Sequence, residues 1–509
     1  MSQLFEWLTE PRSNSSYLFL LLACAAFYII WKIIYNVAFH PLRKYPGPKS
    51  WAMTQIPFSI AWTSGGGHKR IYDLHQKYGD IVRVAPNQLS FGYPEAWDDV
   101  MGHRKRGQAE NGKDPDFWRG NDIYTLVGSN RERHSRLRKI LSHGFSAQAM
   151  MEQQPIFQRY VNLMMDRLKA ASSGGKAVEM TSWVNWATFD MAGDLIFGES
   201  FGCLEKSEFH PWVKLIFKHI QGFAVSTAVI RYPFANTLIR LMTPKSVARD
   251  IQAHNAFTKA QVAKRVAYEN PRPDFMESMI RAQEKGEVSN TEVIANAHNL
   301  IVGSSETTAT TLAGTIYLLA TNRPVLAKLY REIRDTFQDG DEIDLISVQK
   351  LEYMFAVLHE GLRIYPAVPA AIPRKTSQGG MIGSHYVPAD TIIGIWQWPM
   401  FHNPKFFKDP ESFVPERWLG DPKYDSDKKA AMQPFSVGPR NCIGKNLAYA
   451  EMRLILAKLI WHFDLDLDPG SEGWLEKHTA YLLWEKPELW VRLTTRCDPK
   501  GGQQKASGT

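Results

Sequence analysis

Residues 435–444 read Phe-Ser-Val-Gly-Pro-Arg-Asn-Cys-Ile-Gly, and residues 445–461, which follow directly, are predicted to form an amphipathic helix. Cys442 therefore lies on a glycine-flanked turn that leads into a helix, with Arg440 two residues before it. A cysteine gives up its proton when a cation, a helix N-terminus or a metal stabilises the thiolate. Gly438 permits the sharp bend. The small neighbouring residues leave room for a flat cofactor, so this loop is predicted to hold a thiolate against a metal.

This loop resembles the haem-binding loop of the cytochrome P-450 superfamily, Phe-x-x-Gly-x-Arg-x-Cys-x-Gly. Phe435, Gly438, Arg440, Cys442 and Gly444 occupy its fixed positions. Such a match should arise by chance about one time in 10⁴ in a chain of this length. The alternative is an inert cysteine that packs as a small apolar residue, which is usual for an isolated Cys. The resemblance implies haem b, with Cys442 as the axial ligand of the iron and the other four residues as its binding loop.

Composition bounds the class of protein. The chain has 509 residues, 44% of them hydrophobic and 22% charged, which indicates a globular protein rather than a disordered one. Four scattered cysteines are too few for a disulfide framework, so a reducing compartment is expected. The net charge of +8 favours anionic partners such as acidic lipid or an acidic protein. No zinc-finger spacing or aromatic-basic RNA motif is present, so nucleic acid is not expected.

The N-terminal region is predicted to anchor the chain in a membrane. Residues 13–31 carry no charge and are nearly all apolar, which is long enough to span a bilayer. A cleaved signal peptide is the alternative, but its apolar core would be shorter and followed by a small-residue cleavage site. Lys32, Arg43 and Lys44 lie on the C-terminal side, so the body should lie in the cytoplasm.

Three segments are expected along the chain. Residues 1–40 are the membrane anchor, and residues 41–48, with three prolines and a glycine, form a stiff, non-helical hinge. Residues 49–509 form the folded domain. Within it, residues 80–91 read as a β-hairpin around Pro86-Asn87. Residues 289–322 read as a helix that begins with a capping box and is long enough to cross the core.

A polar cluster interrupts the apolar pattern of this long helix. Gly303-Ser304-Ser305-Glu306-Thr307-Thr308 would be costly to bury without partners. One explanation is that the Thr hydroxyls bond to the preceding turn of the helix, as Ser and Thr often do. The resemblance instead implies that Glu306 and Thr307 are a catalytic acid and alcohol that relay protons to bound dioxygen. Ser304 stands where the family usually has Gly, which puts the local water chain in question.

Two further motifs match the same family. Glu360 and Arg363 are spaced as an ordinary helix pair, worth a few tenths of a kcal/mol by itself. They also form the family's Glu-x-x-Arg motif, and Pro415-Glu416-Arg417 forms its Pro-Glu-Arg motif. The resemblance implies a buried triad of Glu360, Arg363 and Arg417 that braces the cysteine loop in a structural role.

Basic residues elsewhere complete the implied haem site. The stretch 131–139 resembles the family's haem-contacting helix, in which His134 and Arg138 would meet a propionate. Arg374, after the extended apolar segment 367–372, is assigned to the cofactor in the same way. Arg136 and Lys139 are expected to face solvent and to meet an electron-donating partner.

The resemblance covers nearly the whole chain and implies a mainly α fold with small β-sheets. This cytochrome P-450 fold has a helix-rich haem domain and a minor β-rich lobe, preceded by an N-terminal transmembrane helix. Residues 40–43, 142–146 and 360–373 look most like microsomal fungal monooxygenases of secondary metabolism. A single-pass protein of the endoplasmic reticulum membrane, with its catalytic domain in the cytoplasm, is therefore expected.

The implied activity is that of a haem-thiolate monooxygenase. It would use O2 to hydroxylate, desaturate, epoxidise or couple an apolar small molecule. No Gly-x-Gly-x-x-Gly fingerprint for NADPH or flavin occurs, so electrons should come from NADPH-cytochrome P-450 reductase or a cytochrome b-type donor. The substrate pocket is expected at residues 117–126, the helix face at 297–303, and residues 367–372 and 480–483.

Two other functions are less well supported by the sequence. Gly198-Glu199-Ser200-Phe201-Gly202 fits the nucleophile elbow of a serine hydrolase, but that elbow needs a strand before it and residues 183–197 favour a helix. A haem-binding carrier or sensor without turnover would not need Glu306 and Thr307. Substrate identity, regiochemistry and oligomeric state do not follow from the sequence.

Overall fold

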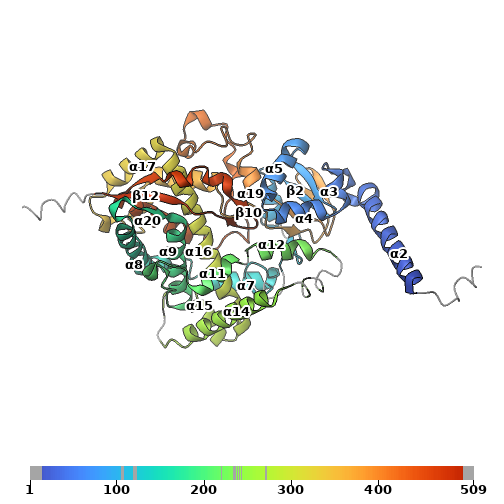
Figure 1. Cartoon of the computed structure of the whole chain (residues 1–509), viewed down its shortest axis with the longest axis horizontal. Coiled ribbons are helices and arrows are strands. Elements are labelled where there is room, and N and C mark those ends of the chain that lie inside the picture. Colours follow the sequence, from blue (N-terminus) through green and yellow to red (C-terminus); the bar gives the residue numbers. More distant parts are fainter. Residues whose placement is uncertain are drawn as a thin grey trace, which may run out of the picture.

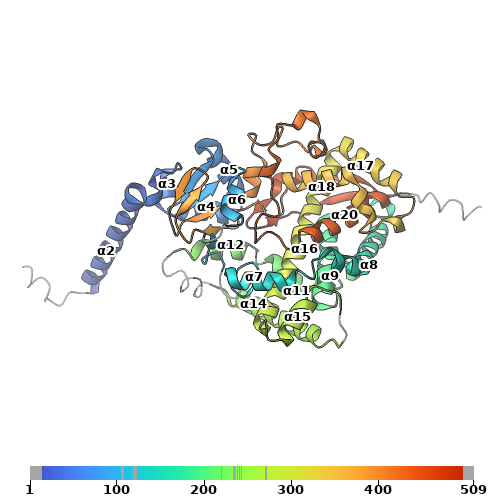
Figure 2. The same cartoon turned by 180° about the vertical axis from the view of Figure 1, so that it is seen from behind.

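Helices dominate the computed structural model, which describes residues 14–104, 108–118, 123–218, 220–232, 243–269 and 272–496, together with 237, 239 and 241. The predicted mainly α class with small sheets is confirmed (Figures 1 and 2). The α-helices are α2 (Asn14–Ile34), α3 (Lys49–Met53), α4 (Ile56–Thr63), α5 (Gly67–Tyr78), α6 (Ala96–Met101), α7 (Arg131–Leu141), α8 (Ala147–Ala171), α9 (Met180–Phe197), α10 (Cys203–Lys206), α11 (Pro211–Lys218), α12 (Ile220–Val229), α14 (Lys245–Val266), α15 (Glu277–Glu284), α16 (Asn290–Thr321), α17 (Arg323–Thr336), α18 (Glu352–Ile364), α19 (Gln397–Phe401) and α20 (Lys445–His462).

The long helix α16 runs through the core, as predicted. Its 32 residues begin with the capping box, in which Ser289 accepts from the Glu292 backbone N–H and the Glu292 side chain accepts from the Ser289 N–H. Most of its side chains are buried, and α9 packs along it. The helix ends at Thr321 because Pro324 follows shortly after.

Within the described residues the strands form four small sheets. The largest has the order β1-β2-β8-β5-β3, and the predicted hairpin is its β1–β2 pair. In this sheet β2 and β8 are parallel, so residues far apart in sequence become neighbours. The strands are β1 (Ile81–Ala85), β2 (Gln88–Phe91), β3 (Gly112–Lys113), β4 (Ala177–Glu179), β5 (Arg374–Lys375), β6 (Gly380–Ile382), β7 (His385–Val387), β8 (Ile392–Gly394), β9 (Phe463–Leu467), β10 (Thr479–Ala480), β11 (Trp484–Glu485) and β12 (Trp490–Thr495).

The largest sheet lies at one end of the molecule, and several long helices lie at the other end together with the sheet that contains β12. The β1-β2 sheet lies with α3, α4 and α5 at the end from which α2 projects, and α8, α9, α17 and α20 lie at the other end (Figures 1 and 2). The helix α2 exposes its apolar side chains and, with the turn that follows it, is long and apolar enough to cross a membrane. Residues 1–13 and Cys497 lie outside the described residues.

Two local predictions were wrong. The hinge is not wholly non-helical, because Pro41–Lys44 form a turn of 3₁₀ helix with proline at its first position, where the missing N–H costs nothing. The helix α20 is not amphipathic, because it is buried on most of its sides between other elements. It begins at Lys445, three residues after Cys442.

Candidate functional site: a cysteine loop beside buried cations

The cysteine loop is held by its own backbone. The Cys442 N–H donates to the Phe435 carbonyl at 2.9 Å, and the Asn441 N–H donates to the Gly438 carbonyl at 3.1 Å. Gly438 has φ +78°, and a Cβ there would lie 2.1 Å from the Met101 carbonyl oxygen. Only glycine fits this bend, because both its conformation and its close neighbour exclude a side chain.

The Cys442 thiol keeps accessible surface although protein surrounds it. Burial raises its pKa, while the Gly444 backbone N–H and the charges of Arg138 and Lys445 lower it by less. The protein alone therefore favours the thiol, and a bound metal would supply the remaining stabilisation of the thiolate. A Cβ on Gly444 would come no nearer than 3.8 Å to any atom, so the space beside the sulfur is open.

Arg440 does not supply the charge beside the sulfur, contrary to the sequence analysis. Its Nε forms an ion pair with Glu110, and its NH1 donates to the Ser129 carbonyl at 2.9 Å. Arg138 takes that place. Its two terminal nitrogens donate to the carbonyl and to Oδ1 of Asn441, both at 2.6 Å, so α7 grips the residue before the cysteine.

Lys113, which the sequence analysis did not identify, lies directly opposite Arg374 on neighbouring strands β3 and β5. Like charges in this arrangement destabilise a sheet. Burial lowers the pKa of Lys113 well below its usual value, and the charges of Arg374 and Arg440 lower it further. Burial also lowers the pKa of Arg374 to about 10, and NH1 of Arg374 is buried without a hydrogen-bond partner.

His134 of α7 lies beside these cations. It is buried, and burial together with Arg440 and Arg138 lowers its pKa to about 3, so its imidazole is neutral. We call Lys113, Arg138, Arg374 and Arg440 the cationic cluster. Among the residues that the structure describes, Glu110 is the carboxylate whose charge acts on Lys113 and Arg374.

The donor set fits the haem that the resemblance implies. A haem brings an iron, which suits the Cys442 sulfur, and two propionates. Buried cations gain most from anions that approach them closely. The unpartnered NH1 of Arg374 and the Lys113–Arg374 repulsion indicate that the cationic cluster can accept further negative charge.

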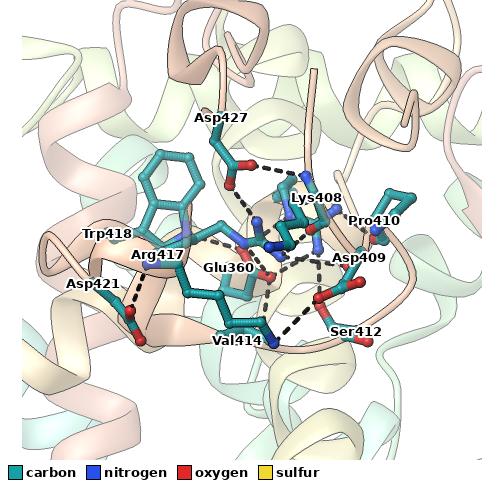
Figure 3. Close-up of polar contacts among 12 residues, drawn as sticks. Glu360, Lys408, Asp409, Pro410, Ser412, Val414, Arg417, Trp418, Asp421 and Asp427 are labelled. Atoms are coloured by element: carbon teal, nitrogen blue, oxygen red, sulfur yellow. Dashed lines mark hydrogen bonds and ion pairs between the residues drawn. The ribbon is translucent and has the colours of Figure 1, made fainter. Parts of the chain in front are cut away.

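Glu360, Arg363 and Arg417 meet in a fully buried network (Figure 3). Arg363 donates to both Glu360 oxygens, at 2.7 and 2.9 Å. Arg417 Nε donates to Oε1 of Glu360 at 3.0 Å, and Trp418 Nε1 donates to Oε2 at 2.9 Å. Arg417 also forms an ion pair with a second carboxylate, Asp427, which was not predicted from the sequence. Because Asp427 lies in the segment that leads to residue 435, this network braces the chain just before the cysteine loop.

Glu306 and Thr307 are adjacent on α16 but do not bond to each other. The Thr307 hydroxyl donates to the Gly303 carbonyl at 2.7 Å, which is the local alternative weighed above. Glu306 is fully buried and forms an ion pair with Lys486. Ser304 likewise donates to its own helix, at the Leu300 carbonyl. Gly303 is exposed and Thr307 is half-buried, although most of α16 is buried, and a Cβ on Gly303 would meet no atom within 4 Å, so this face of the helix is open.

The predicted pocket segments partly converge. Phe117, Ala370 and Tyr481 lie in one apolar cluster, to which α12 adds Ala224. The helix face at 297–303 belongs in part to the main core, where Ala297 and Ile301 are fully buried. Residues 119–122 of the expected pocket loop lie outside the described residues.

The hydrolase reading is not favoured. Ser200 follows the helix α9 and not a strand, and its Oγ accepts from the Gly202 N–H at 3.1 Å. The strained strand-to-helix turn that exposes a nucleophilic serine is therefore missing at this position.

Comparisons with known proteins identify the family of the chain. The family model described as Cytochrome P450 matches residues 45–491. The chain is 45% identical to trichothecene C-15 hydroxylase of Fusarium sporotrichioides, over 92% of this chain and 96% of that protein. It is 41% identical to averantin hydroxylase of Dothistroma septosporum, over 92% and 90%. It is also 41% identical to the cytochrome P450 monooxygenase aclL of Aspergillus oryzae, over 92% and 96%.

These similarities span the helices, the sheets and the cysteine loop together. The relatives are named as monooxygenases or hydroxylases, which makes this chain an oxygenase enzyme. The chain belongs to the cytochrome P450 family.

Proposed function

We propose that this enzyme oxidises an apolar small molecule in fungal secondary metabolism, with hydroxylation as its main reaction and electrons from NADPH-cytochrome P450 reductase. The observation that carries the proposal is the accessible Cys442 thiol on a braced loop beside buried cations. The names of the relatives support the reaction class.

Haem b is the proposed cofactor, with Cys442 as the ligand of its iron. Arg374, Lys113 and Arg440 would neutralise the propionates, and His134 would donate a hydrogen bond. When bound, the haem supplies the dioxygen chemistry, which an axial thiolate favours. Gly438 and Gly444 shape the loop, and Phe435 packs against Tyr449, with ring centroids 5.2 Å apart, to support it.

Arg138 has a different role from the predicted one. Its guanidinium already binds Asn441 through two short hydrogen bonds. We therefore propose that Arg138 mainly positions the loop and places positive charge near the Cys442 sulfur. Burial lowers the pKa of Arg138, and a negative charge on Cys442 acts in the opposite direction.

Glu306 and Thr307 are proposed to carry protons into the site. Thr307 can turn its hydroxyl from the Gly303 carbonyl toward the open face of α16. Glu306 can then supply a new proton to the Thr307 hydroxyl, because an acid of suitable geometry can donate a proton directly or through one water. Ser304 need not disturb this path while its hydroxyl donates to Leu300.

The apolar cluster around Phe117, Ala370 and Tyr481 is the proposed substrate side. A small cavity nearby, lined by Phe58, Trp62, Phe117, Ala371 and Trp396 among others, lies between α4 and α12. These helices lie at the end of the molecule that bears α2 (Figure 1). An apolar substrate could therefore enter from the membrane side.

Residues 1–40 are proposed as a single-pass anchor in the endoplasmic reticulum membrane, 41–48 as a hinge and 49–509 as the cytoplasmic catalytic domain. Ile56 and Ile60 of α4 and Val225 of α12 are exposed apolar residues on the same end of the molecule. Their exposure supports contact between this end and lipid.

A basic groove on α7 is the proposed docking site for the reductase or a cytochrome b-type donor. It has a volume of about 390 Å³, and Arg131, Arg138 and Lys139 contribute to its lining. Arg136 is less available than predicted, because Glu292 forms an ion pair with it. Turnover should weaken as salt rises, because exposed charges are screened.

The test is reconstitution of the full chain with reductase and NADPH in membranes, with fungal metabolite extracts as substrate. Mass spectrometry should reveal products that carry one added oxygen, and Cys442→Ala protein should form none. A haem-loaded wild-type protein that consumes no NADPH with any extract would instead favour the carrier or sensor.

A further inference from the structure

The ion pair between Glu306 and Lys486 is buried on both sides. The side chains are 1% and 4% exposed, respectively. Lys486 Nζ also donates to Thr310 Oγ1 at 2.8 Å, and Thr310 donates to Oε1 of Glu306 at 3.3 Å. The other carboxylate oxygen, Oε2, is buried without a hydrogen-bond partner. Burying two charges is costly unless they are well paired, so the stability and position of this carboxylate depend on its ion pair with Lys486.

The charges of Glu306 and Lys486 also shift the pKa values of two neighbouring groups, Tyr365 and His478. Burial and the charge of Glu306 raise the pKa of Tyr365 well above its usual value. Burial and the charge of Lys486 lower the pKa of His478 to about 3. The Tyr365 hydroxyl and Nδ1 of His478 are hydrogen-bonded at 2.7 Å. Glu306 is therefore bonded to Lys486 and Thr310, its charge acts on Tyr365, and it has no hydrogen bond to the Thr307 hydroxyl, which donates to Gly303.

Lys486 belongs to a hairpin that reaches the substrate side. It directly follows β11, and His478 directly precedes β10, so both ends of the hairpin lie in this polar cluster. The tip between the strands carries Tyr481, which is buried in the apolar cluster with Phe117. A shift of the tip would therefore act on Lys486 through two short strands.

The helix α12 contacts the same hairpin one residue before Lys486. Gln221 Nε2 donates to both carboxylate oxygens of Glu485, at 2.9 and 3.0 Å. Ala224 and Ala228 of α12 pack in the apolar cluster beside the tip. The path from α12 to Glu306 is therefore contiguous: Gln221, Glu485, Lys486, Glu306.

We propose that Lys486 is a positioning residue that holds the Glu306 carboxylate out of reach of Thr307 until a bound apolar substrate shifts the hairpin and α12. This gate rests on the proposed function of Glu306 and Thr307. When Lys486 is drawn away, water enters with the opening, and a solvent hydronium ion gives a proton to the carboxylate and becomes water. The protonated Glu306 then turns toward the Thr307 hydroxyl oxygen, which accepts this proton as the O–H bond of Glu306 breaks and releases its own proton into the site. The gate ties proton supply to the presence of substrate.

The first test needs no turnover. In resting, haem-loaded, full-length protein without substrate, Lys486→Met leaves Glu306 buried without its cation, and such a carboxylate takes up a proton. Infrared difference spectra should show a new protonated-carboxyl C=O band that is absent from wild type and from the Glu306→Gln/Lys486→Met double variant. Lys477→Met, an exposed change in the same region, should add no band. Absence of the new band in Lys486→Met would overturn the proposal.

The second test follows hydrogen peroxide from substrate-free protein with reductase and NADPH. Lys486→Met should raise peroxide about tenfold, within the usual range of coupling between sites, and Gln221→Ala should raise it less. Lys486→Arg and Lys477→Met should match wild type. The double variant contains no unpaired buried charge, so it should fold, and its peroxide should fall well below that of Lys486→Met.

A leak that persists in the double variant would mean that Lys486 only supports packing, and the proposal would fail. If wild-type protein took up no electrons from reductase, the proposed function would fail instead. The infrared spectra would still show whether Glu306 becomes protonated in Lys486→Met.

Discussion

Glu360 and Glu306 are both fully buried glutamates paired with cations, yet their surroundings differ. Each oxygen of Glu360 accepts at least two hydrogen bonds, from two arginines, a tryptophan and the backbone. On Glu306 one oxygen takes all the contacts and the other takes none. A fully satisfied buried network rigidifies its surroundings, whereas a half-satisfied one can rearrange at lower cost.

The difference follows from what supplies the cations. Arg363 comes from α18, the same helix as Glu360, and Arg417 comes from a segment tied down by Asp427 and by backbone contacts. Lys486 comes from the end of a two-residue strand. One cluster is therefore suited to fix the cysteine loop and the other to change during the reaction.

The largest expected effect is on the Glu360 network. Glu360→Gln leaves two buried guanidinium groups without their shared charge, so unfolding free energy should fall by about 3–5 kcal/mol and haem content should drop. Denaturant titration and the haem-to-protein ratio measure both. Glu416→Gln, on the 3₁₀ turn Pro415–Trp418 that carries Arg417, removes a partly exposed pair with Lys328 and should cost less than about 1 kcal/mol. Equal costs for the two variants would contradict the assigned rigidity.

A third buried carboxyl, Glu451 on α20, tests burial without a paired cation. Burial raises its pKa from 4.5 to about 8, and a hydrogen bond to Thr308 lowers it by less. The folded protein therefore holds a proton that the unfolded chain releases between about pH 4.5 and 8. Stability should fall as pH rises through this window, by on the order of a few kcal/mol. In Glu451→Gln this part of the pH dependence should vanish, and an unchanged profile would refute the assignment.

Thr307→Ala tests whether the region around Glu306 supplies protons to the reaction. Haem binding should be unchanged, while product formation per NADPH falls by about 10²-fold and peroxide takes its place, because a proton-relay group is lost. Thr311→Ala is the matched control, since Thr311 also donates to its own helix, at the Thr307 carbonyl. Its coupling should equal that of wild type. Unchanged coupling in Thr307→Ala would remove Thr307 from the relay.

The smallest expected effect concerns Lys113. Lys113→Met removes a like-charge pair across β3 and β5, so haem-free protein should gain about 0.2–1 kcal/mol of stability. Haem titration should show weaker binding, because a cation that meets a propionate is lost. Lys375 lies on the same strand as Arg374 but pairs with Asp390. Lys375→Met should therefore neither stabilise the haem-free protein nor weaken haem binding. Haem affinity unaffected by Lys113→Met would exclude Lys113 from the site.

Sequence patterns predicted the features that local chemistry determines. The capping box and apolar period of α16, the β1–β2 turn and the cysteine loop with Gly438 each lie within one continuous stretch. Lys113, Asp427 and Lys486 carry no local signal of this kind. They reach their partners only through the β3–β5 pairing, the segment before the cysteine loop and the C-terminal hairpin. Arg440 was placed beside the sulfur from sequence distance, but Glu110 draws it away.

The most direct test of the account is the absorption spectrum of the reduced carbon monoxide complex of purified full-length protein. Wild type should show the long-wavelength Soret band of a thiolate-ligated haem, and Cys442→Ser should lose it. A band that survives Cys442→Ser, or folded wild-type protein that stays colourless when haem is supplied, would contradict the central claim.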